Sequence, residues 1–592
     1  MYELTVSNVH IEGGQFMKKM VKLSICLALA CSMVACSPKK AADTDTVGGN
    51  QSADNVLTGK AKGFGGEVIA TVTLKEGKIV SVVIDGSKET KGIGTLAIDQ
   101  IPGKIIDKGS TDVDVVATAT VTSNAIIAAV NNALDPEKYP YATDEENAGV
   151  TKTPEVVVAA EVFQGFGLSN LGRVGPGKDD KDVQVYSINQ VFANVLFDAE
   201  GRVLDLYVDQ LEVATPNYDG DSMPHFSGFP GQKGYNLDSN HDGKIDGVTE
   251  DTDENFLEEI SSWATKRDRG EGYRMGTGTW ASQMDKFQSL FVGKTVAEIK
   301  EWYTKYCSDV NGRPLKADST NEADVTKYNA LSDADKTMLA DVVSGATMSL
   351  NDNHGNIIEA IEIAYNNRKG LDIKGAAAIG LGLDSSGRIG PGKDDKDVSV
   401  YSINEVYANT LFDAEGKIVA IHVDQLEIST PNYDGDSMPH FSGFPGQEGY
   451  NLDSNHDGAI DGVSVPTEET FNSEISTWET KRDRGESYVM GTGNWASQMD
   501  KFESIFIGKT VEEVEEWFAK YCSDLNGRPL KVDASKEEDV KKYNALTSEE
   551  QAMLADVVSG ATMSLNDSHG DIVSAIRKSF ENKATIDLTV GK

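Results

Sequence analysis

The chain has 592 residues, of which 39% are hydrophobic and 25% charged, so it is long enough for three or four globular domains of ordinary composition. Its formal net charge is −39. Such a charge repels phosphate groups, which argues against a nucleic-acid partner. It favours solubility, a cationic partner or bound metal ions.

The N-terminal region has the pattern of an exported lipoprotein. Three lysines precede the apolar run 23–33, which is too short to span a bilayer and is typical of a signal peptide. The run ends in Met-Val-Ala-Cys36, which looks like a bacterial lipobox. Cleavage before Cys36 and acylation of its thiol would tether the protein to the outer face of a membrane. We therefore expect a signal peptide over residues 1–36, with Met17 as the true start; an ordinary signal peptide with a chance cysteine is the alternative.

Internal repetition divides the rest of the chain. The segment 175–182 returns at 390–397, and Thr347 returns as Thr562, in each case 215 residues later. We predict two large repeats at 156–370 and 371–592. A smaller domain is predicted at 55–136, between a flexible tether at 37–54 and a linker at 137–155. Cys307 and Cys522 occupy matching positions of the large repeats and are expected to be buried apolar residues.

The predicted elements of the small domain alternate between strand and helix patterns. In chain order they are strands at 67–74 and 79–85, a helix at 96–108 interrupted at Pro102, a short strand at 113–116, and a helix at 124–134 capped by Ser123.

The large repeats carry the same hairpin with an insert after it. The hairpin is predicted at 186–197 and 203–208 and is repeated within 401–423, with helices following at 256–266 and 296–306. From the turn glycine to the later threonine is 43 residues between Gly77 and Thr120, but 146 between Gly201 and Thr347. We therefore predict an α+β fold with three related domains, the second and third enlarged by about 100 inserted residues.

One short polar motif occurs three times. Asp341-Val-Val-Ser-Gly-Ala-Thr347 recurs unchanged as Asp556-Val-Val-Ser-Gly-Ala-Thr562. A looser copy, Asp114-Val-Val-Ala-Thr-Ala-Thr120, lies in the small domain, where Thr118 replaces the glycine. Three copies of one turn indicate three copies of one functional site.

Together with Gly63-Phe-Gly-Gly-Glu67, Glu89-Thr90 and Gly92-Ile-Gly94, this motif resembles the FMN-binding domain family. The family includes subunits of sodium-pumping quinone reductases and Rnf complexes, domains of secreted reductases, and lipoproteins of extracellular electron transfer. The resemblance implies that a flavin transferase moves FMN from FAD onto the last hydroxyl of the motif, as a phosphoester. It covers the whole small domain, but mainly the hairpin and motif of the large repeats. The implied cofactor site comprises Thr120, Thr347, Thr562, Asp114, Asp341, Asp556, Ser344, Gly345, Ala346, Ser559, Gly560 and Ala561.

The residue types suit such an attachment. A threonine hydroxyl is a weak nucleophile with no activating base in the motif, so an external, metal-assisted enzyme is expected to modify it. Gly345 and Ala346 leave room for a phosphate, and the N–H groups that open a following helix are expected to bind it. In the looser copy, the Cβ of Thr118 is expected to crowd the phosphate, so modification of Thr120 is the weaker prediction.

Asp-rich loops in the inserts have spacing like that of an EF-hand. Alternate oxygen-bearing side chains converge on one cation in such loops, and a glycine permits the sharp turn. Position twelve, however, is Thr249 or Ser464 instead of the usual glutamate. We predict Ca²⁺ loops, with a solvated polar turn as the alternative; the predicted ligands are Asp238, Asn240, Asp242, Asp246, Asp453, Asn455, Asp457 and Asp461.

Two further patterns allow more than one interpretation. Gly276-x-Gly278-x-Trp280, followed by Gln283-Met284, suits either a surface on which the flavin stacks or ordinary core. Arg267 and Arg269 suit phosphate binding, but a solvated charged face is the better expectation.

No dinucleotide-binding, P-loop or hydrolase motif is evident, so we predict a redox carrier, or a subunit of an oxidoreductase system, without its own substrate site. Such a lipid-anchored protein would relay electrons from a membrane NADH dehydrogenase or quinone-linked donor to an extracellular acceptor or reductase. The alternatives are a non-redox, Ca²⁺-stabilised surface lipoprotein, as an adhesin or solute receptor, and the redox subunit of a secreted reductase.

Overall fold

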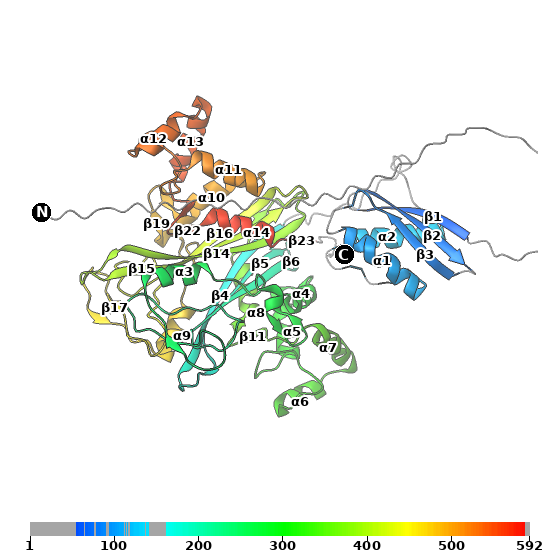
Figure 1. Cartoon of the computed structure of the whole chain (residues 1–592), viewed down its shortest axis with the longest axis horizontal. Coiled ribbons are helices and arrows are strands. Elements are labelled where there is room, and N and C mark those ends of the chain that lie inside the picture. The colour runs from blue at the N-terminus through cyan, green and yellow to red at the C-terminus, as the bar shows by residue number, and fades with distance from the viewer. Residues whose placement is uncertain are drawn as a thin grey trace, which may run out of the picture. The chain divides into compact units, whose positions relative to one another are not determined.

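The computed structural model describes residues 55–140 and 162–586, except 64–65, 76–77, 90–93, 112, 114, 117–118 and 137, and the side chains of residues 107, 120 and 121. The predicted signal peptide, the lipid-attachment site at Cys36, the tether and most of the linker lie outside these residues. The chain forms two compact units, Met1–Thr151 and Lys152–Lys592, which are considered separately (Figure 1).

The small unit is a three-stranded antiparallel sheet with two helices. Strands β1 (Asn55–Lys62), β2 (Glu67–Lys75) and β3 (Lys78–Asp85) pair in chain order, and helices α1 (Gly94–Lys108) and α2 (Thr120–Leu134) pack on the sheet. Alternate residues of β2, such as Val68 and Val72, are fully buried beneath the helices. Helix α2 lies so close to β1 that a Cβ on Gly59 would come within 2.2 Å of the backbone oxygen of Ala129.

The strand predictions at 67–74 and 79–85 are confirmed, but three other expectations for the small unit are wrong. No strand forms at the described residues of 113–116, since α2 already begins at Thr120. Ser123 is therefore inside the helix, where its hydroxyl oxygen accepts a hydrogen bond from the backbone N–H of Val116 instead of capping the helix. Helix α1 continues through Pro102, because Ile101 and Ile105 on either side are fully buried.

The large unit contains two four-stranded antiparallel sheets, one from each repeat. The first has the order β13-β4-β5-β6 and the second the order β16-β15-β14-β23. In each sheet the short fourth strand is contributed by the chain that follows the repeat's last helix. The strands are β4 (Val162–Lys178), β5 (Gln184–Phe197), β6 (Val203–Ala214) and β13 (Lys369–Leu371), then β14 (Ala378–Lys393), β15 (Ser399–Phe412), β16 (Ile418–Ser429) and β23 (Ala584–Thr585).

Each repeat also carries six α-helices and three short hairpins, whose strands are two residues long. The first repeat has α3 (Asp253–Ser261), α4 (Trp280–Phe291), α5 (Val296–Tyr306), α6 (Glu322–Asn329), α7 (Asp333–Gly345) and α8 (Ile357–Asn366), with hairpins β7/β8 (Asn236–Leu237, Gly247–Val248), β9/β10 (Arg274–Met275, Gly278–Thr279) and β11/β12 (Asn351–Asp352, Gly355–Asn356). The second has α9 (Glu468–Ser476), α10 (Trp495–Phe506), α11 (Val511–Tyr521), α12 (Glu537–Asn544), α13 (Ser548–Gly560) and α14 (Ile572–Glu581), with hairpins β17/β18 (Asn451–Leu452, Gly462–Val463), β19/β20 (Val489–Met490, Gly493–Asn494) and β21/β22 (Asn566–Asp567, Gly570–Asp571).

The helix predicted at 296–306 is confirmed as α5, whereas that predicted at 256–266 ends five residues early, at Ser261. The long first strand of each repeat was not predicted. In the view of Figure 1, helices α5–α7 and α11–α13 project on opposite sides of the paired sheets.

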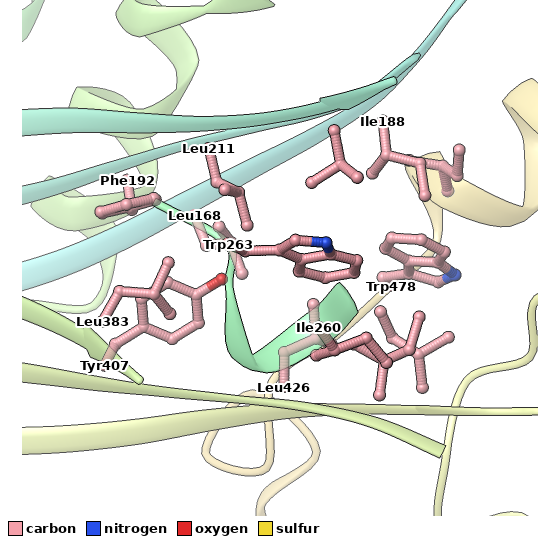
Figure 2. Close-up of a cluster of buried hydrophobic side chains, with 14 of the residues drawn as sticks. Leu168, Ile188, Phe192, Leu211, Ile260, Trp263, Leu383, Tyr407, Leu426 and Trp478 are labelled. Atoms are coloured by element: carbon pink, nitrogen blue, oxygen red, sulfur yellow. The ribbon is translucent and has the colours of Figure 1, made fainter. Parts of the chain in front are cut away.

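The two repeats share one hydrophobic core. Figure 2 shows Phe192 and Leu211 of the first sheet facing Tyr407 and Leu426 of the second, with side chains of the inserts between them. The exchange is reciprocal, because α3 of the first repeat packs on β14 and α9 of the second packs on β4. The Tyr186 hydroxyl donates to Glu468 (3.1 Å), and the matching Tyr401 hydroxyl donates to Asp253 (2.7 Å). The insert of each repeat therefore packs against, and hydrogen-bonds to, the sheet of the other repeat.

The architecture confirms the predicted α+β class, with small antiparallel sheets and fourteen helices in the described part of the chain. Among the same residues, none of the helices combines the length and the apolar character needed to cross a bilayer. Cys307 and Cys522 are buried free thiols, as expected.

Candidate functional site

In the large repeats, the threonine motif lies at the C-terminal end of a helix. Asp341 to Gly345 form the last turn of α7, and Thr347 follows the extended C-cap residue Ala346. The next helix, α8, begins only at Ile357, after the β11/β12 hairpin. The expectation that a following helix presents its N–H groups at this threonine is therefore wrong for the large repeats. A phosphate there would need other donors.

One buried glutamine holds the backbone around each threonine. The Gln283 side-chain oxygen accepts from the backbone N–H groups of Thr347 (2.8 Å) and Met348 (3.1 Å), and from the Thr347 hydroxyl (3.3 Å). Its amide nitrogen donates to the Met275 carbonyl at 2.5 Å. Gln498 makes the same contacts to Thr562 (2.8 Å) and Met563 (3.2 Å). Gln283 is fully buried, so its amide fixes the position of Thr347, a residue that is itself half-buried.

A glycine turn passes over the threonine hydroxyl. Gly276 has φ +56°, and a Cβ on it would lie 3.1 Å from the hydroxyl oxygen of Thr347. Gly491 has the same relation to Thr562, with φ +58° and 3.1 Å. The two glycines thus leave open the space into which a group bonded to each hydroxyl would extend. This arrangement fits a phosphoester on these threonines.

A lysine supplies positive charge beside the motif. Lys286 of α4 pairs with Asp341 at 2.7 Å, and Lys501 of α10 pairs with Asp556 at 2.6 Å. The stem of Lys286 lies 3.4 Å from the position that a Cβ on Gly345 would occupy. Both aspartates are largely exposed, so each ion pair contributes little to stability and would not prevent the lysine from binding a phosphate at the motif. These lysines are therefore the side chains that could bind a phosphate here, in place of the helix N–H groups that were expected.

A cavity adjoins Met348, the residue after the motif. Its wall includes Tyr273, Met275, Trp280 and the buried Lys266. Polar residues such as Arg313, Asp352 and His354 complete the wall, so the cavity is mixed in character. Its volume of about 40 Å³ is room for a few waters and is much less than a flavin ring needs.

Lys266 belongs to a buried ionic cluster. It pairs with Glu212 at 2.7 Å, and Arg173 pairs with the same carboxylate at 2.8 Å. Burial alone would raise the pKa of Glu212, but the two cations outweigh it and hold this pKa below its ordinary value. In the second repeat, burial would likewise raise the pKa of Glu427, but Lys481, His569 and Arg388 together lower it to about 2. Both carboxylates therefore remain ionised at neutral pH, and each cluster carries one net positive charge.

The small unit places the third motif differently. Helix α2 begins at Thr120, so here the motif does lead directly into a helix. Thr122 of the first turn donates to Glu89 at 2.5 Å, and Gly94 lies close enough that its Cβ would be 3.0 Å from the Thr122 hydroxyl oxygen. The side chain of Thr120, like Asp114 and Thr118, is outside the described residues. The predicted crowding by Thr118 is therefore not addressed by the structure.

For the Gly-x-Gly-x-Trp pattern, the core role is confirmed at Trp280 and Met284, and flavin stacking stays a prediction. Trp280 and Met284 are buried in the core of the repeat, whereas Gly276 and Gln283 contact the threonine. The expectation of a solvated face is wrong for Arg267. Its guanidinium is buried over the ring of Tyr207, 4.6 Å from the centroid, and donates to the backbone oxygen of Val208. Because Arg267 lies in a polar stretch of sequence, its stacking on Tyr207 could not be predicted from the residues around it.

Sequence reasoning missed the lysines and the buried glutamates. Glu212 stands between Leu211 and Val213 in a strand whose neighbours are apolar, and a charge in that context was the available signal. Lys286 has no such signal, since it lies on an exposed part of an amphipathic helix.

The Asp-rich loops form compact turns. Asp238 accepts hydrogen bonds from the N–H groups of Asp242 (3.2 Å) and Gly243 (2.9 Å), while Asp246 accepts from Ser239. Asn240 and Asp242 accept from backbone N–H groups within the loop. Across the described residues, no group of three or more His, Cys, Asp or Glu side chains is arranged to hold a metal ion. Calcium at the predicted set of ligands stays a prediction.

Comparison with known proteins places part of this chain in a family. Residues 63–135 match the model of the FMN-binding domain. A chlorophenol reductase of Desulfitobacterium hafniense is 32% identical over 219 residues, which are 36% of this chain and 59% of the relative. An NADH:acrylate oxidoreductase of Vibrio harveyi is 36% identical over 19% of this chain and 12% of its own length. A urocanate reductase of Eggerthella lenta is 29% identical over 23% of this chain and 24% of its own length.

The chain thus spans from 12% to 59% of these relatives' lengths. The family match and the related reductases support a flavin-based role in electron transfer, with FMN as the cofactor. Residues 63–135 are a domain of the FMN-binding family.

Proposed function

We propose that Thr347 and Thr562, and more weakly Thr120, each carry FMN as a phosphoester, and that the protein relays electrons between other redox partners. The observation that carries the proposal is the same arrangement in both large repeats: a half-buried threonine hydroxyl fixed by a buried glutamine and left open by a positive-φ glycine.

The sequence around each site is also shared with the small unit. Gly-x-Gly-Thr overlaps the start of α1 and directly precedes α4, and Gly-x-Gly-Asn directly precedes α10. Within each unit, the first of these helices packs near the last strand of the meander, and the final helix packs on the first two strands. These features support three domains of one type, of which the second and third carry inserts.

Attachment requires a flavin transferase and FAD. The threonine oxygen forms a bond to the FMN-side phosphorus of FAD, the bond between the two phosphates breaks, AMP leaves with the electron pair, and the hydroxyl proton passes to solvent. In the product, Thr347 holds the phosphate covalently and Lys286 balances its charge. We propose that the ring lies against the side of the wall formed by Tyr273 and Trp280, since the cavity itself, at about 40 Å³, is too small to enclose it; Lys266 is the nearby buried cation.

FMN supplies reversible transfer of electrons, and the protein sets its position and potential. A flavin next to a buried cation favours the reduced, more negatively charged form, so the Lys266 and Lys481 clusters are expected to raise the potential of their flavins. Covalent attachment suits a location outside the cytoplasm, where a dissociated flavin would be lost.

We further propose that Cys36 carries the lipid that holds the protein at the extracytoplasmic membrane face. A membrane NADH dehydrogenase or a quinone-linked enzyme would be the donor, and an extracellular acceptor or reductase the recipient. Substitution Cys36→Ser should release the protein from the membrane fraction and abolish labelling by a fatty acid. Retention at the membrane with unchanged labelling would contradict this anchor.

The test of the redox proposal is a titration of the purified, flavin-loaded protein, followed by absorbance. The expected result is reversible bleaching of a protein-bound flavin spectrum that survives denaturation, with no turnover of a small substrate by the protein alone. A colourless protein after production with a flavin transferase would exclude the proposal.

A further inference from the structure

A polar cavity lies in the second repeat, between the tip of the β14–β15 hairpin and the Asp-rich loop. It has a volume of about 330 Å³, and its wall includes Asp394, Asn432, Tyr433, Asp434 and Asp453. A cavity of this size holds a cation together with several waters, since one water needs only about 10–15 Å³ of such space. The lining therefore determines what can occupy it.

Asn432 presents an unpaired oxygen at this cavity. The residue is 2% exposed, and its amide nitrogen donates to Asp394 (2.9 Å) and to the backbone oxygens of Val398 (3.3 Å) and Ser399 (3.3 Å). Because these three partners are all acceptors, the amide cannot be turned over, and its oxygen is the atom left without a partner. A buried acceptor left unpaired costs about 1–3 kcal/mol, which a bound cation would recover.

Besides Asp394, which accepts from the Asn432 amide, two further carboxylates line the cavity. Asp453 is 1% exposed, and its position is fixed by the N–H groups of Asp457 (3.2 Å) and Gly458 (2.9 Å), which leave further lone pairs on both oxygens. Asp434 reaches over the same turn, 3.3 Å from where a Cβ on Gly458 would lie. The lysine in the wall, Lys393, does not neutralise them, because it pairs with Asp397 at 3.0 Å.

The first repeat has the same three groups. Asn217 is 2% exposed, donates to Asp179 at 3.0 Å, and also has an unpaired buried oxygen. Asp238 is 1% exposed, and Asp219 lies 3.2 Å from the Cβ position of Gly243. The unpaired amide oxygen is thus a feature of both copies.

We propose that each repeat binds one Ca²⁺ ion at this place. Asn432, Asp434 and Asp453 are the side-chain ligands in the second repeat, and Asn217, Asp219 and Asp238 in the first; backbone carbonyls and waters complete each shell. The donors are all oxygen, and the roomy cavity suits the six to eight ligands of Ca²⁺ better than the compact octahedron of Mg²⁺. Asp394 is not among the proposed ligands, because both its oxygens already accept hydrogen bonds, one from the N–H groups of Lys396 and Val398 and the other from the amides of Asn432 and Asn451.

This set differs from an EF-hand loop. In an EF-hand, Asp461 would occupy the ninth position, but both its oxygens accept from Ser454, through the hydroxyl at 2.5 Å and the backbone N–H at 3.4 Å. The ligand that closes the site comes instead from upstream, at Asp434. Asp461 is therefore a matched control, an aspartate of the same loop outside the proposed shell.

The position of the ion indicates its role. The Asp-rich loop leads into α9, which packs on β4 of the other repeat and accepts the hydrogen bond from Tyr186. An ion that fixes the loop therefore also fixes the start of α9 and its contacts with the other repeat. The ion is thus expected to stabilise the joined repeats without taking part in flavin chemistry.

The test uses the full chain after treatment with a chelator, titrated with Ca²⁺ by calorimetry and with Tb³⁺ by luminescence excited through Tyr433 and its counterpart Tyr218. Wild type should bind two Ca²⁺ ions and melt at a higher temperature with Ca²⁺ than with the same concentration of Mg²⁺. Asp434→Asn and Asp219→Asn, which alter exposed side chains, should each weaken one site by more than tenfold, and the double variant should bind none. Asp461→Asn should bind two ions as wild type does.

Absence of Ca²⁺ binding by folded wild type would overturn the proposal. So would loss of a site in Asp461→Asn with both sites intact in Asp434→Asn, since that result assigns the ion to the EF-hand positions.

Discussion

The side-chain oxygen of Gln283 lies 2.8 Å from the backbone nitrogen of Thr347 and 3.3 Å from its hydroxyl oxygen, although 64 residues separate the two in the chain. Helix α4 thereby holds the backbone at Thr347, two residues after the end of α7. The second repeat reproduces this relation between Gln498 and Thr562. The chain therefore contains an internal control for any change at either site.

Substitution Gln283→Ala should impair flavin attachment at Thr347 alone. It leaves the N–H groups of Thr347 and the buried Met348 without an acceptor, at a cost of about 1–3 kcal/mol for each unsatisfied group. We expect a lower melting temperature and less FMN on the peptide that contains Thr347, with the Thr562 peptide fully loaded. Gln498→Ala should give the opposite pattern. A parallel fall at both sites would show that the glutamine acts on overall folding instead.

Substitution Gly276→Ala should block attachment through crowding. Its Cβ would lie 3.1 Å from the Thr347 hydroxyl oxygen, on a backbone with φ +56°. Gly293 is the matched control, because it has φ +82° and no atom within 4 Å of its Cβ position. Both alanine variants carry backbone strain of about 1–3 kcal/mol, but only Gly276→Ala should lose FMN at Thr347 by peptide mass spectrometry. Equal loading of the two variants would contradict the crowding argument.

Removal of the buried ammonium should affect both stability and flavin potential. Lys266→Met breaks a buried ion pair with Glu212 and should lower the free energy of unfolding by about 3–5 kcal/mol. It should also lower the potential of the flavin at Thr347, measured by spectroelectrochemistry. The exposed pair of Lys300 and Glu362 is the control, for which Lys300→Met should change stability by less than about 1 kcal/mol and leave the potential unchanged. A potential that is the same in Lys266→Met and wild type would place the ring away from this cavity.

In the core between the repeats, one carboxyl group, that of Glu405, has an amide at the corresponding position of the other repeat. Glu405 accepts a hydrogen bond from Gln190, its counterpart in the first repeat, at 2.6 Å, and another from the Tyr407 hydroxyl at 2.9 Å. Burial raises its pKa from 4.5 to about 7. Because the folded-state pKa is raised, the stability contribution is complete below pH 4.5 and falls as pH rises towards 7.

Substitution Glu405→Gln should remove this pH dependence. The amide keeps the oxygen that Gln190 and Tyr407 use, and glutamine is the residue already present at position 190. We expect the melting temperature of Glu405→Gln to exceed that of wild type at pH 8 by more than it does at pH 5. The same difference at both values would show that Glu405 is ionised in the fold throughout this range.

Some of this architecture could be predicted from the sequence and some could not. The hairpins around Gly77 and Gly201 follow from alternating apolar residues and a turn glycine, and the threonine motif from exact repetition. The long strand β4 was missed because Gly165 and Gly167 interrupt its pattern. These glycines allow the backbone of α8 to approach, since their Cβ atoms would lie 1.8 and 2.0 Å from the oxygens of Ala364 and Ala360. From the sequence alone, a glycine that permits close packing inside a strand cannot be distinguished from a glycine in a loop.

Contacts between the repeats could not be predicted either. The pairing of Tyr186 with Glu468 depends on two segments 282 residues apart, and nothing local in either one indicates a partner. The helix expected directly after Thr347 was wrong for another reason. In the small unit α2 starts at the motif, but in the large repeats a hairpin separates the motif from the next helix, so the small unit did not predict their local structure.

The central claim is that Thr347 and Thr562 are the attachment points of FMN. The most direct measurement is the intact mass of the protein produced together with a flavin transferase, for wild type, Thr120→Ala, Thr347→Ala, Thr562→Ala and the double variant at 347 and 562. Wild type should carry at least two FMN groups, each single change at 347 or 562 should remove one, and the double variant should retain at most the one at Thr120. An unmodified wild-type mass would contradict the account and favour a non-redox surface-binding protein. An unchanged FMN count in the double variant would contradict it as well, by placing the attachment points at other residues.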